Sequence, residues 1–379
     1  MKKKILFIIP IYSHGGTNRS LQFLLSLINP QEFDIYILCL IDKGIYKETF
    51  NNYKTIKLST KLHLFFNSNN IIIKFIRLLD RILNYKLLKF FSKREISNIE
   101  KNYKFDKIIG YEEGIATYFT SFFNSPKVAW VHCDYHYYKN KNKKIEKLTY
   151  PNINQIVCVS KHTSQSFKNY YPTLERRITY AYNLLNEKEI IELSKEKITD
   201  NRFNNSTFTI ISIGRYDPIK QFDKIPEIAK KIYNIGNCKY FKWYIIGCGN
   251  EEYTKIIESN ICKYQLQDTV ILLGEKSNPY PYIKNSNILV STSLSEACPY
   301  VINEAKILKK IVVSTNYESA SELIGDDNGV ITSLNTMHTI LYNLINNKDS
   351  GYTILNDKVS KYTFNITNDR NKIISIINQ

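Results

Sequence analysis

Apolar runs alternate with helical patterns along most of the chain. The runs are continuous, which is typical of strands buried on both faces of a parallel sheet. Amphipathic stretches lie between them, as at 21–28, where Pro30 ends the predicted helix. This alternation predicts an α/β protein. The predicted strands are 5–11, 33–41, 107–110, 127–131, 155–160, 207–213, 240–246, 269–273, 287–290 and 311–314.

The length of the chain indicates two domains. One hydrophobic core seldom serves more than about 300 residues, and this sequence has 379, of which 43% are hydrophobic. The stretch 183–205 is rich in Asn, Glu and Lys and poor in apolar residues, so it is the expected interdomain region. We therefore predict domains at 1–185 and 186–364, followed by a terminal segment, 365–379, that ends as a short helix.

The cysteines and the first residues of the chain indicate the cellular compartment in which we expect the protein. Seven cysteines are scattered without a C-x-x-C pair, so we expect reduced thiols in a cytoplasmic protein. Residues 1–10 imitate a signal peptide, but Pro10 and the polar residues after it cut the apolar run short, which favours a first strand. No run of about eighteen uncharged apolar residues occurs, so the sequence predicts no membrane span.

The net charge of +17 is concentrated in the first half of the chain. Residues 1–185 hold 29 Lys and Arg against 13 Asp and Glu, a balance of +16, and the remainder holds 23 against 22. This one-sided field suggests an anionic partner, whether acidic membrane lipid, a phosphate-linked acceptor or nucleic acid. A Lys-rich composition without function would give the same excess. No recognised nucleic-acid motif accompanies the charge, so we expect no nucleic-acid partner.

Residues 71–100 have the pattern of one or two basic amphipathic helices. Apolar residues lie on one side, and cations such as Lys74, Arg77 and Arg81 lie on another. A helix of this kind can lie on an anionic membrane surface. More often such an apolar stripe is the side that faces the core, and both interpretations stay open.

A glycine turn follows the first predicted strand. Ser13-His14-Gly15-Gly16 leads into the helix predicted at 21–28. A strand, a glycine turn and a helix place backbone N–H groups at the carboxyl end of a strand, where phosphates bind. Gly-Gly turns are common, so this motif alone is a weak signal.

His132 and Asp134 follow the predicted strand 127–131. The end of such a strand is where open α/β sheets bind ligands. His132 could be a metal ligand, a catalytic or sugar-binding residue, or a structural histidine. His136 lies four residues on, but no Glu follows His132 and the pair lies on no clear helix, which argues against zinc. Asp134 could orient the imidazole.

Two cations lie in one short loop after the predicted strand 207–213. Arg215 and Lys220 can converge there on one diphosphate, and Gly214 permits a close approach of the backbone. Surface cations are usually only solvated, so this interpretation needs a companion motif.

Two common motifs are absent from the sequence. Gly247 and Gly249 follow the strand 240–246, but Glu252 stands where the dinucleotide fingerprint needs a third glycine. No D-x-D occurs either, so a metal held by that motif on a diphosphate is not indicated. We therefore expect no metal and no cofactor.

Two glutamates flank the start of a predicted helix in the segment 291–306. Glu296 lies in the loop after the strand 287–290, and Glu304 lies on the helix. Pro299 suits the first helical turn, where its missing N–H leaves nothing unpaired. Two carboxylates around a helix N-terminus frame a site for a sugar nucleotide, which offers hydroxyls and phosphates together.

The sequence resembles the retaining glycosyltransferases of family 4, the group 1 glycosyltransferases. The resemblance covers nearly the whole chain and implies the GT-B fold, in which two Rossmann-like, doubly wound domains face each other across a cleft. It rests on five features in that family's order: Gly15-Gly16, His132-x-Asp134, Gly214-Arg215 with Lys220, Gly274 followed by Pro279 and Pro281, and Glu296 with Glu304.

The resemblance implies a role for each domain. Domain 1–185 would bind the acceptor, and domain 186–364 would bind the nucleotide sugar. The terminal helix, 365–379, would cross back to the first domain.

The resemblance also implies roles for single residues. Arg215 and Lys220 would bind the diphosphate, Glu296 would hold hydroxyls of the transferred sugar, and His132 would lie near the reacting sugar. Glu304 would bind the ribose hydroxyls, and Gly16 would approach the phosphates. The other substrate-binding positions are Gly15, Asp134, Gly274, Ala297, Cys298 and Pro299.

The sequence departs from the family pattern in two places. The family commonly has Glu-Gly-Phe-Pro where this chain has Glu296-Ala297-Cys298-Pro299, and a small residue with a Gly is usual near 308–310. Ala297 keeps a backbone N–H for a phosphate or sugar oxygen, but it cannot adopt every glycine conformation. The sugar specificity is therefore left open.

The resemblance implies a retaining, metal-independent glycosyltransferase, either a hexosyl- or an N-acetylhexosaminyltransferase. It would move a sugar from a nucleotide-sugar donor, expected to be UDP-linked, to a growing surface glycan such as capsular polysaccharide, lipopolysaccharide or another lipid-linked saccharide. It would be cytoplasmic, peripheral on the inner face of the cell membrane. The alternatives are a nucleotide-sugar-binding subunit that has lost turnover and a nucleotide-sugar 2-epimerase on the same fold.

Overall fold

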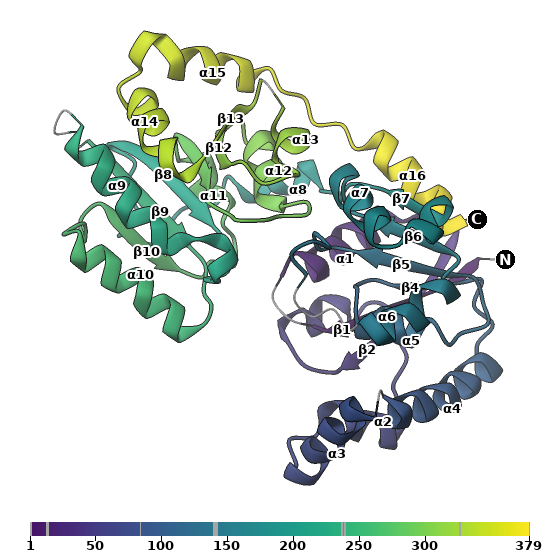
Figure 1. Ribbon diagram of the computed structural model, residues 1–379. Helices are drawn as coiled ribbons and strands as arrows, with labels where there is room; N and C mark the ends of the chain where they lie inside the picture. The colour runs from purple at the N-terminus through teal and green to yellow at the C-terminus, as the bar shows by residue number, and fades with distance from the viewer. Residues whose placement is uncertain are drawn as a thin grey trace. The chain divides into compact units, whose positions relative to one another are not determined.

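The chain divides into two units, each built around its own parallel sheet (Figure 1). The N-terminal unit comprises Met1–Leu185 and Ile366–Gln379, and the C-terminal unit comprises Asn186–Asn365. The computed structural model describes residues 2–12, 15–83, 85–138, 143–235, 238, 240–325 and 327–378.

The N-terminal unit has a seven-stranded sheet in the order β3-β2-β1-β4-β5-β6-β7, with every pair parallel. Its order reverses between β1 and β4, which is the switch point of a doubly wound sheet. The side chains of Ile5 to Ile9 on β1 are fully buried, as their continuous apolar run predicts. The strands are β1 (Lys3–Ile11), β2 (Phe33–Ile41), β3 (Lys54–Thr55), β4 (Lys107–Gly110), β5 (Lys127–Val131), β6 (Gln155–Cys158) and β7 (Ile178–Tyr180).

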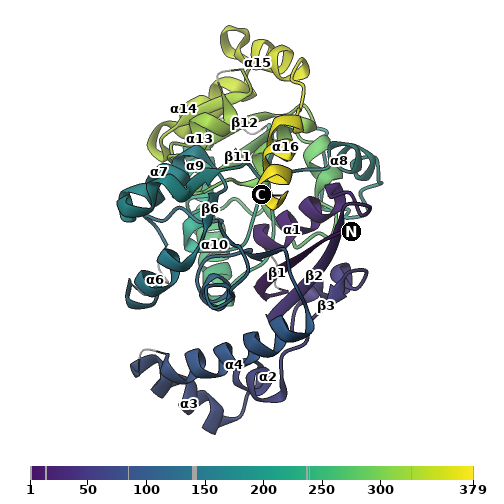
Figure 2. The same cartoon turned by 90° about the vertical axis from the view of Figure 1, so that its right-hand side faces the viewer.

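Helices cover this sheet, and one group of them projects from it. Figures 1 and 2 both show α2, α3 and α4 lying together, away from most of the sheet. The helices of the unit are α1 (Gly16–Leu27), α2 (Thr60–Asn67), α3 (Ile71–Ile82), α4 (Lys86–Asn102), α5 (Ile115–Thr120), α6 (Lys143–Thr149), α7 (Lys161–Tyr170) and α16 (Thr367–Asn378).

The last helix, α16, packs on the N-terminal unit. Its apolar side chains Ile373, Ile376 and Ile377 are buried. At its C-terminal end Lys107 Nζ donates to the carbonyl of Ile376 at 2.5 Å. A cation suits the carbonyl end of a helix, because the helix dipole is negative there. The end of the chain is therefore held by apolar packing and by a buried lysine.

The C-terminal unit has a six-stranded sheet in the order β10-β9-β8-β11-β12-β13, again parallel throughout. Its switch point lies between β8 and β11. The strands are β8 (Phe208–Ile213), β9 (Phe241–Ile246), β10 (Val270–Gly274), β11 (Ile288–Ser291), β12 (Ile311–Thr315) and β13 (Gly329–Thr332). The helices are α8 (Glu187–Leu193), α9 (Ile225–Asn234), α10 (Glu251–Lys263), α11 (Tyr280–Lys284), α12 (Tyr300–Ile307), α13 (Ala320–Ile324), α14 (Leu334–Ile345) and α15 (Gly351–Ser360).

The predicted fold class is confirmed, because both units are doubly wound parallel sheets. The structure adds two details to the prediction. The stretch 183–205 is not a plain linker, since it contains α8. The region 71–100 forms two helices, α3 and α4, and the apolar stripe of α3 is exposed instead of facing a core. Among the described residues, no helix combines the length and the apolar character needed to cross a membrane.

Candidate active site

The candidate site of the C-terminal unit is formed where strands end. The carboxyl ends of parallel strands meet at one edge of a sheet, so the loops after β8, β9, β10 and β11 lie together. They meet closely. A Cβ atom on Gly247 would lie 1.9 Å from the carbonyl oxygen of Gly214, and one on Gly249 would lie 2.2 Å from that of Tyr216. The Gly247-x-Gly249 pair therefore serves the packing of two strand-end loops.

Lys220 and Glu296 form an ion pair at this edge. Lys220 ends the short helix η4 (Pro218–Lys220), whose first N–H groups include one donated by Ile219 to Asp217 Oδ1 at 2.9 Å. The side chains of Lys220 and Glu296 are 17% and 15% exposed. Gly214 makes room for the lysine stem, because a Cβ there would lie 3.2 Å from Lys220 Cε. The structure thus brings together two residues that the sequence analysis assigned to one donor.

Hydroxyl side chains fix the loop that carries Glu296. Ser293 Oγ donates to Glu296 Oε1 at 2.7 Å, and Ser319 Oγ donates to the Glu296 carbonyl at 2.7 Å. Thr292 Oγ1 donates to the carbonyl of Lys220 at 2.6 Å, which ties the two loops together. The sequence analysis missed these residues, although the run Ser291-Thr-Ser-Leu-Ser295 after an apolar strand was a visible signal.

Arg215 differs from Lys220 in its surroundings. Its side chain is exposed, and no ion pair joins it to any described residue. An exposed arginine beside a half-buried lysine leaves a bidentate donor open to an anion. Gly274, at the end of β10, has a φ of +71°, and no heavy atom lies within 4 Å of the place of a Cβ.

The helix α12 begins beside the Glu296 loop. Pro299 is its N-cap residue, one position before the helical turn predicted for it, and its own side chain makes no capping hydrogen bond. Ala297 and Cys298 are 6% and 7% exposed. Glu304, on α12 as predicted, is 2% exposed. Burying a carboxylate this deeply costs free energy unless the carboxylate has hydrogen-bond or ionic partners.

Lys306 lies two residues beyond Glu304 and was not predicted. Burial lowers the pKa of its ammonium group to about 8. Its Nζ donates to the carbonyl of Leu323 at 2.6 Å and lies 4.6 Å from the centre of the Tyr362 ring. Lys306 thus ties α12 to α13 and to the segment after α15.

The glycine turn of the N-terminal unit opens α1. Gly15 is the N-cap, with a φ of +152° that side-chain residues rarely adopt, and Gly16 is the first helical residue. Gly15 carries no side chain that could cap this helix start, and a helix N-terminus attracts anions through its backbone N–H groups and its dipole. Ser13 and His14, the other residues of the predicted turn, lie outside the described residues.

His132 follows β5 in the N-terminal unit and is partly buried. Its backbone N–H donates to Glu113 Oε2 at 2.9 Å, and its ring centre lies 4.9 Å from that of Tyr111. Burial lowers the pKa of the imidazole to about 3, so the ring is neutral near pH 7. Its buried Nε2 has no hydrogen-bond partner among the described residues. A buried ring nitrogen in this state suits a substrate hydroxyl.

Asp134 has other contacts than the predicted one with His132. Its Oδ1 accepts from the His136 N–H at 2.9 Å and from Ser166 Oγ at 3.1 Å, and its Oδ2 lies 3.4 Å from His162 Nε2. Asp134 is 4% exposed. It therefore joins the end of β5 to α7, and the orientation of His132 comes from its backbone bond and from Tyr111.

Glu113 is a further residue that the sequence analysis missed. Burial raises the pKa of its carboxyl, although hydrogen bonds from the N–H groups of His132 and Glu113 and from the Cys133 thiol oppose that shift. Glu113 follows β4, and His132 follows β5, the adjacent strand. It is thus a positioning residue that fixes the backbone of His132.

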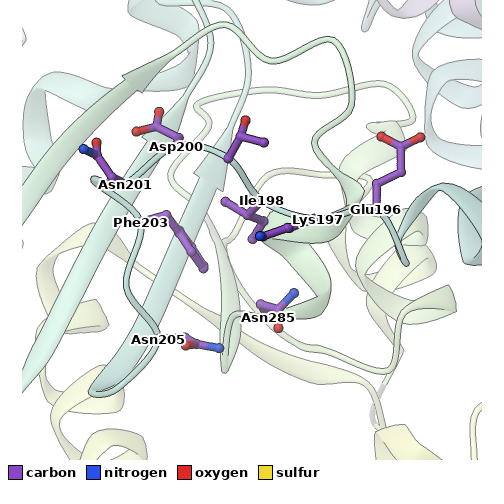
Figure 3. Close-up of a pocket in the computed structure, with 9 residues that line it drawn as sticks. Glu196, Lys197, Ile198, Asp200, Asn201, Phe203, Asn205 and Asn285 are labelled. Atoms are coloured by element: carbon purple, nitrogen blue, oxygen red, sulfur yellow. The ribbon is translucent and has the colours of Figure 1, made fainter.

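The C-terminal unit also has a hollow away from these residues. Figure 3 shows its lining, which includes Glu196, Lys197, Asp200, Phe203 and Asn285. Asp200 is already paired with Arg202 at 2.6 Å and Lys276 at 2.7 Å. None of the predicted site residues lines this hollow.

Three comparisons relate the chain to known proteins. Residues 194–346 match the family described as "Glycosyl transferases group 1". The chain is 26% identical over 180 residues to the uncharacterized glycosyltransferase MJ1059 of Methanocaldococcus jannaschii, a match that covers 45% of this chain and 41% of that protein.

A second relative matches over most of its length. The N-acetylgalactosamine-N,N'-diacetylbacillosaminyl-diphospho-undecaprenol 4-alpha-N-acetylgalactosaminyltransferase of Campylobacter jejuni is 25% identical over 339 residues, which is 86% of this chain and 84% of that protein. Among solved structures, HepE of Anabaena in complex with UDP-glucose is similar, with a TM-score of 0.76, 15% identity and 99% of both chains covered. That likeness shows a shared fold.

Proposed function

We propose that this chain, whose residues 194–346 match the group 1 glycosyltransferases and whose fold is GT-B, transfers a sugar from a UDP-linked donor to a lipid-linked saccharide acceptor. The donor proposal is supported by HepE, which was solved with UDP-glucose. The acceptor proposal is supported by the Campylobacter jejuni relative, whose name describes a diphospho-undecaprenol-linked saccharide.

The observation that carries the proposal is the Lys220–Glu296 ion pair beside the exposed Arg215. A diphosphate offers Lys220 a second anionic partner and offers Arg215 a first one. Once Lys220 contacts phosphate, Glu296 becomes available to accept hydrogen bonds from hydroxyls of the sugar. One loop cluster then recognises both halves of the donor, as the family resemblance implies for these residues.

The proposed reaction retains the configuration of the anomeric carbon. The bond between that carbon and the diphosphate oxygen breaks, and its electron pair leaves on the nucleotide. The acceptor oxygen forms a bond to the same face of that carbon, and its proton passes to the leaving phosphate. Arg215 and Lys220 stabilise the negative charge that develops on the nucleotide without a metal ion, because fixed cations need no reorganisation during the step.

In the N-terminal unit, His132 is assigned the role of binding a substrate hydroxyl. Its neutral ring and its buried Nε2 can exchange one hydrogen bond with a sugar hydroxyl. The start of α1 at Gly15 and Gly16 is assigned to a phosphate.

A screen of nucleotide sugars tests the function. We expect one UDP-sugar to raise the melting temperature of the native protein, since a ligand at 100 times its Kd stabilises by about 2.7 kcal/mol. The variant Arg215→Ala should respond less. Lys255→Ala, which removes an exposed cation of α10, is the matched control and should respond like the native protein.

Product analysis then separates the functions. Mass spectrometry should find the sugar on a diphospho-polyprenol saccharide and UDP released in equal amount. Donor binding without any product would instead identify a binding subunit. An altered sugar still attached to the nucleotide, formed without acceptor, would identify an epimerase.

A further inference from the structure

The helix α3 holds its apolar side in solvent. Ile71, Phe75 and Ile82 are 79%, 58% and 68% exposed. At 3.6 residues per turn, the apolar positions cover an arc of about 160° on this helix. The other exposed apolar residues of the arc are Ile72, Ile76, Leu78, Leu79 and Leu83.

The polar side of α3 is the one turned toward the protein. Asp80 is 1% exposed and accepts hydrogen bonds from the N–H groups of Leu87 at 2.8 Å and Leu88 at 3.1 Å, at the start of α4. Arg77 donates to the carbonyl of Ser68 at 2.6 Å, after α2. This arrangement inverts that of an ordinary surface helix. Polar contacts therefore fix α3 with its apolar side outward.

The neighbouring helices of the same projecting group also expose apolar residues. Leu64 of α2 is 47% exposed, and Phe90 of α4 is 63% exposed. Both figures that show the whole chain place α2, α3 and α4 as one projecting group (Figures 1 and 2). Isolated exposed apolar residues need no explanation, but a contiguous patch on one projecting group indicates a binding surface.

The charge of this helical group is one-sided. Residues 60–102 hold nine Lys and Arg against three Asp and Glu. Asp80 and Glu95, two of the three acids, are buried. Lys74 and Arg81 are exposed and lie along one edge of the apolar arc. A second copy of this chain would place cations against cations, so self-association through this patch is disfavoured.

We propose that α3, with the adjoining parts of α2 and α4, docks this protein onto an anionic lipid bilayer. The aliphatic and aromatic side chains enter the boundary between headgroups and acyl chains, about 5–10 Å deep, as interfacial helices do. The flanking cations contact anionic headgroups. The docking rests on the proposed function only for its purpose, which is to bring the enzyme to a lipid-linked acceptor.

Vesicle binding tests the proposal without any substrate. We expect the protein to sediment with vesicles that contain about 30% phosphatidylglycerol, as interfacial amphipathic helices bind anionic lipid. Its binding to pure phosphatidylcholine vesicles should be at least about tenfold weaker. The double variant Ile71→Ser/Phe75→Ser should lose tenfold or more of the partition coefficient. The control is Ile256→Ser/Ile354→Ser, which removes two half-exposed isoleucines from the C-terminal unit and should bind as the native protein does.

The cations are tested separately. Lys74→Glu and Arg81→Glu should each weaken binding about fivefold or more at low salt, since each juxtamembrane cation contributes about that factor. Raising the salt concentration should reduce binding of the native protein, because the charge is screened. Lys195→Glu and Lys255→Glu, at exposed positions of the C-terminal unit, are the controls and should change binding less than twofold.

Tryptophan fluorescence tests which residues enter the bilayer. The two natural tryptophans, Trp130 and Trp243, are buried. A tryptophan introduced by Phe75→Trp should shift its emission to the blue on anionic vesicles and should be quenched by brominated lipid. Tyr240→Trp places the probe at a position of the C-terminal unit that is 77% exposed, and it should show neither change.

Three results would overturn the proposal. Equal binding of the native protein and the α3 variants to anionic vesicles would place the membrane surface elsewhere. Absence of binding to any vesicle would exclude a lipid bilayer as the binding partner of α3. A dimer in sedimentation velocity without lipid, lost in Ile71→Ser/Phe75→Ser, would identify a second copy as the occupant. Each result leaves the donor screen untouched, so a failure here is distinct from a failure of the proposed function.

Discussion

At the scale of single residues, the candidate donor site contains two cations with different surroundings. Lys220 is half-buried and paired with Glu296, whereas Arg215 is exposed and joined to no described partner by an ion pair. A residue that is paired in the protein contributes to stability and to binding, and an exposed residue contributes to binding alone. Stability and activity should therefore respond differently to substitution at the two positions.

The first prediction follows from this difference. We expect Arg215→Ala and Lys220→Ala each to lower kcat by about a hundredfold or more, which corresponds to roughly 3 kcal/mol of barrier. Each substitution removes a fixed cation that stabilises the negative charge on the leaving nucleotide. Lys220→Ala should also lower the melting temperature, since it leaves the Glu296 carboxylate without its cation. Arg215→Ala should not. Steady-state kinetics and thermal melts measure the two effects, and an unchanged kcat in Arg215→Ala would remove that residue from the site.

The second prediction concerns the buried histidine. The pKa of His132 falls from about 6.5 in the unfolded chain to about 3 in the folded protein. Between these values the unfolded state binds a proton that the folded state does not, so the stability contributed by this neutral ring is complete above about pH 6.5 and falls as the pH is lowered toward 3. At pH 5 the loss should be about 2 kcal/mol relative to pH 7.

Urea unfolding at pH 7 and pH 5 measures this loss. His132→Gln should remove most of the difference between the two pH values. His63→Gln, at an exposed histidine of α2, is the control and should leave the difference as it is. If both variants lose stability between pH 7 and pH 5 as the native protein does, the acid sensitivity does not come from His132.

At the scale of elements, the strand-end loops of the C-terminal unit are fixed by glycines. Gly247 has a φ of +148°, and a Cβ there would lie 1.9 Å from the carbonyl oxygen of Gly214. Gly274 has a φ of +71°, but a Cβ there would meet nothing within 4 Å. The two positions share the conformational demand and differ in the space available.

The third prediction compares these glycines. Gly274→Ala should cost only the strain of a positive φ, about 1 kcal/mol. Gly247→Ala adds a backbone clash and should cost several times as much, because the loops after β8 and β9 must separate. Denaturant unfolding measures both costs, and nucleotide-sugar binding should be lost in Gly247→Ala alone. Equal costs for the two variants would contradict the close packing of these loops.

Interior strands and the edge strand β10 were predictable from the sequence, but the edge strands β3, β7 and β13 were not. The strands β4 and β5 have the bounds that their apolar runs predicted, because both faces of an interior parallel strand are buried. The edge strand β3 is two residues long and exposed, and the edge strand β13 is only half-buried. Neither presents a continuous apolar run, so the period and the length that identify an interior strand were missing.

The candidate site was predictable by position more than by contact. Parallel strand ends meet at one edge, so the sequence could place Arg215 and Glu296 in the same loop cluster. The ion pair of Glu296 with Lys220 joins residues 76 positions apart and depends on loop conformations and side-chain rotamers. The same holds for Glu113, whose bond to the His132 backbone depends on the adjacency of β4 and β5. Such contacts follow from the fold and are not encoded by local patterns.

At the scale of the whole molecule, the two units have separate cores and a shared chain. Trp130 lies in β5 of the N-terminal unit, and Trp243 lies in β9 of the C-terminal unit, both fully buried. Each unit thus contains one natural fluorescent reporter of its own unfolding. The end of the chain belongs to the first unit, since α16 packs there through Ile373, Ile376 and Ile377.

The fourth prediction uses these reporters. A chain that ends at Asn365 should expose the apolar surface that α16 covers and should leave Lys107 without the Ile376 carbonyl. Burying three isoleucines is worth roughly 5–9 kcal/mol at most, and that figure is an upper limit because the unfolded chain is partly compact. We therefore expect the N-terminal unit to unfold at much lower denaturant, while the C-terminal unit keeps its midpoint.

Single-tryptophan variants measure the two transitions separately. In Trp243→Phe the remaining Trp130 should report an early transition after truncation, and in Trp130→Phe the remaining Trp243 should report an unchanged one. Ile354→Ser, at an exposed position of α15, is the control and should change the free energy of unfolding of neither unit by more than about 0.5 kcal/mol. If truncation moved both midpoints together, the two units would unfold as one cooperative body, and α16 would contribute to the stability of the whole chain and not of one unit.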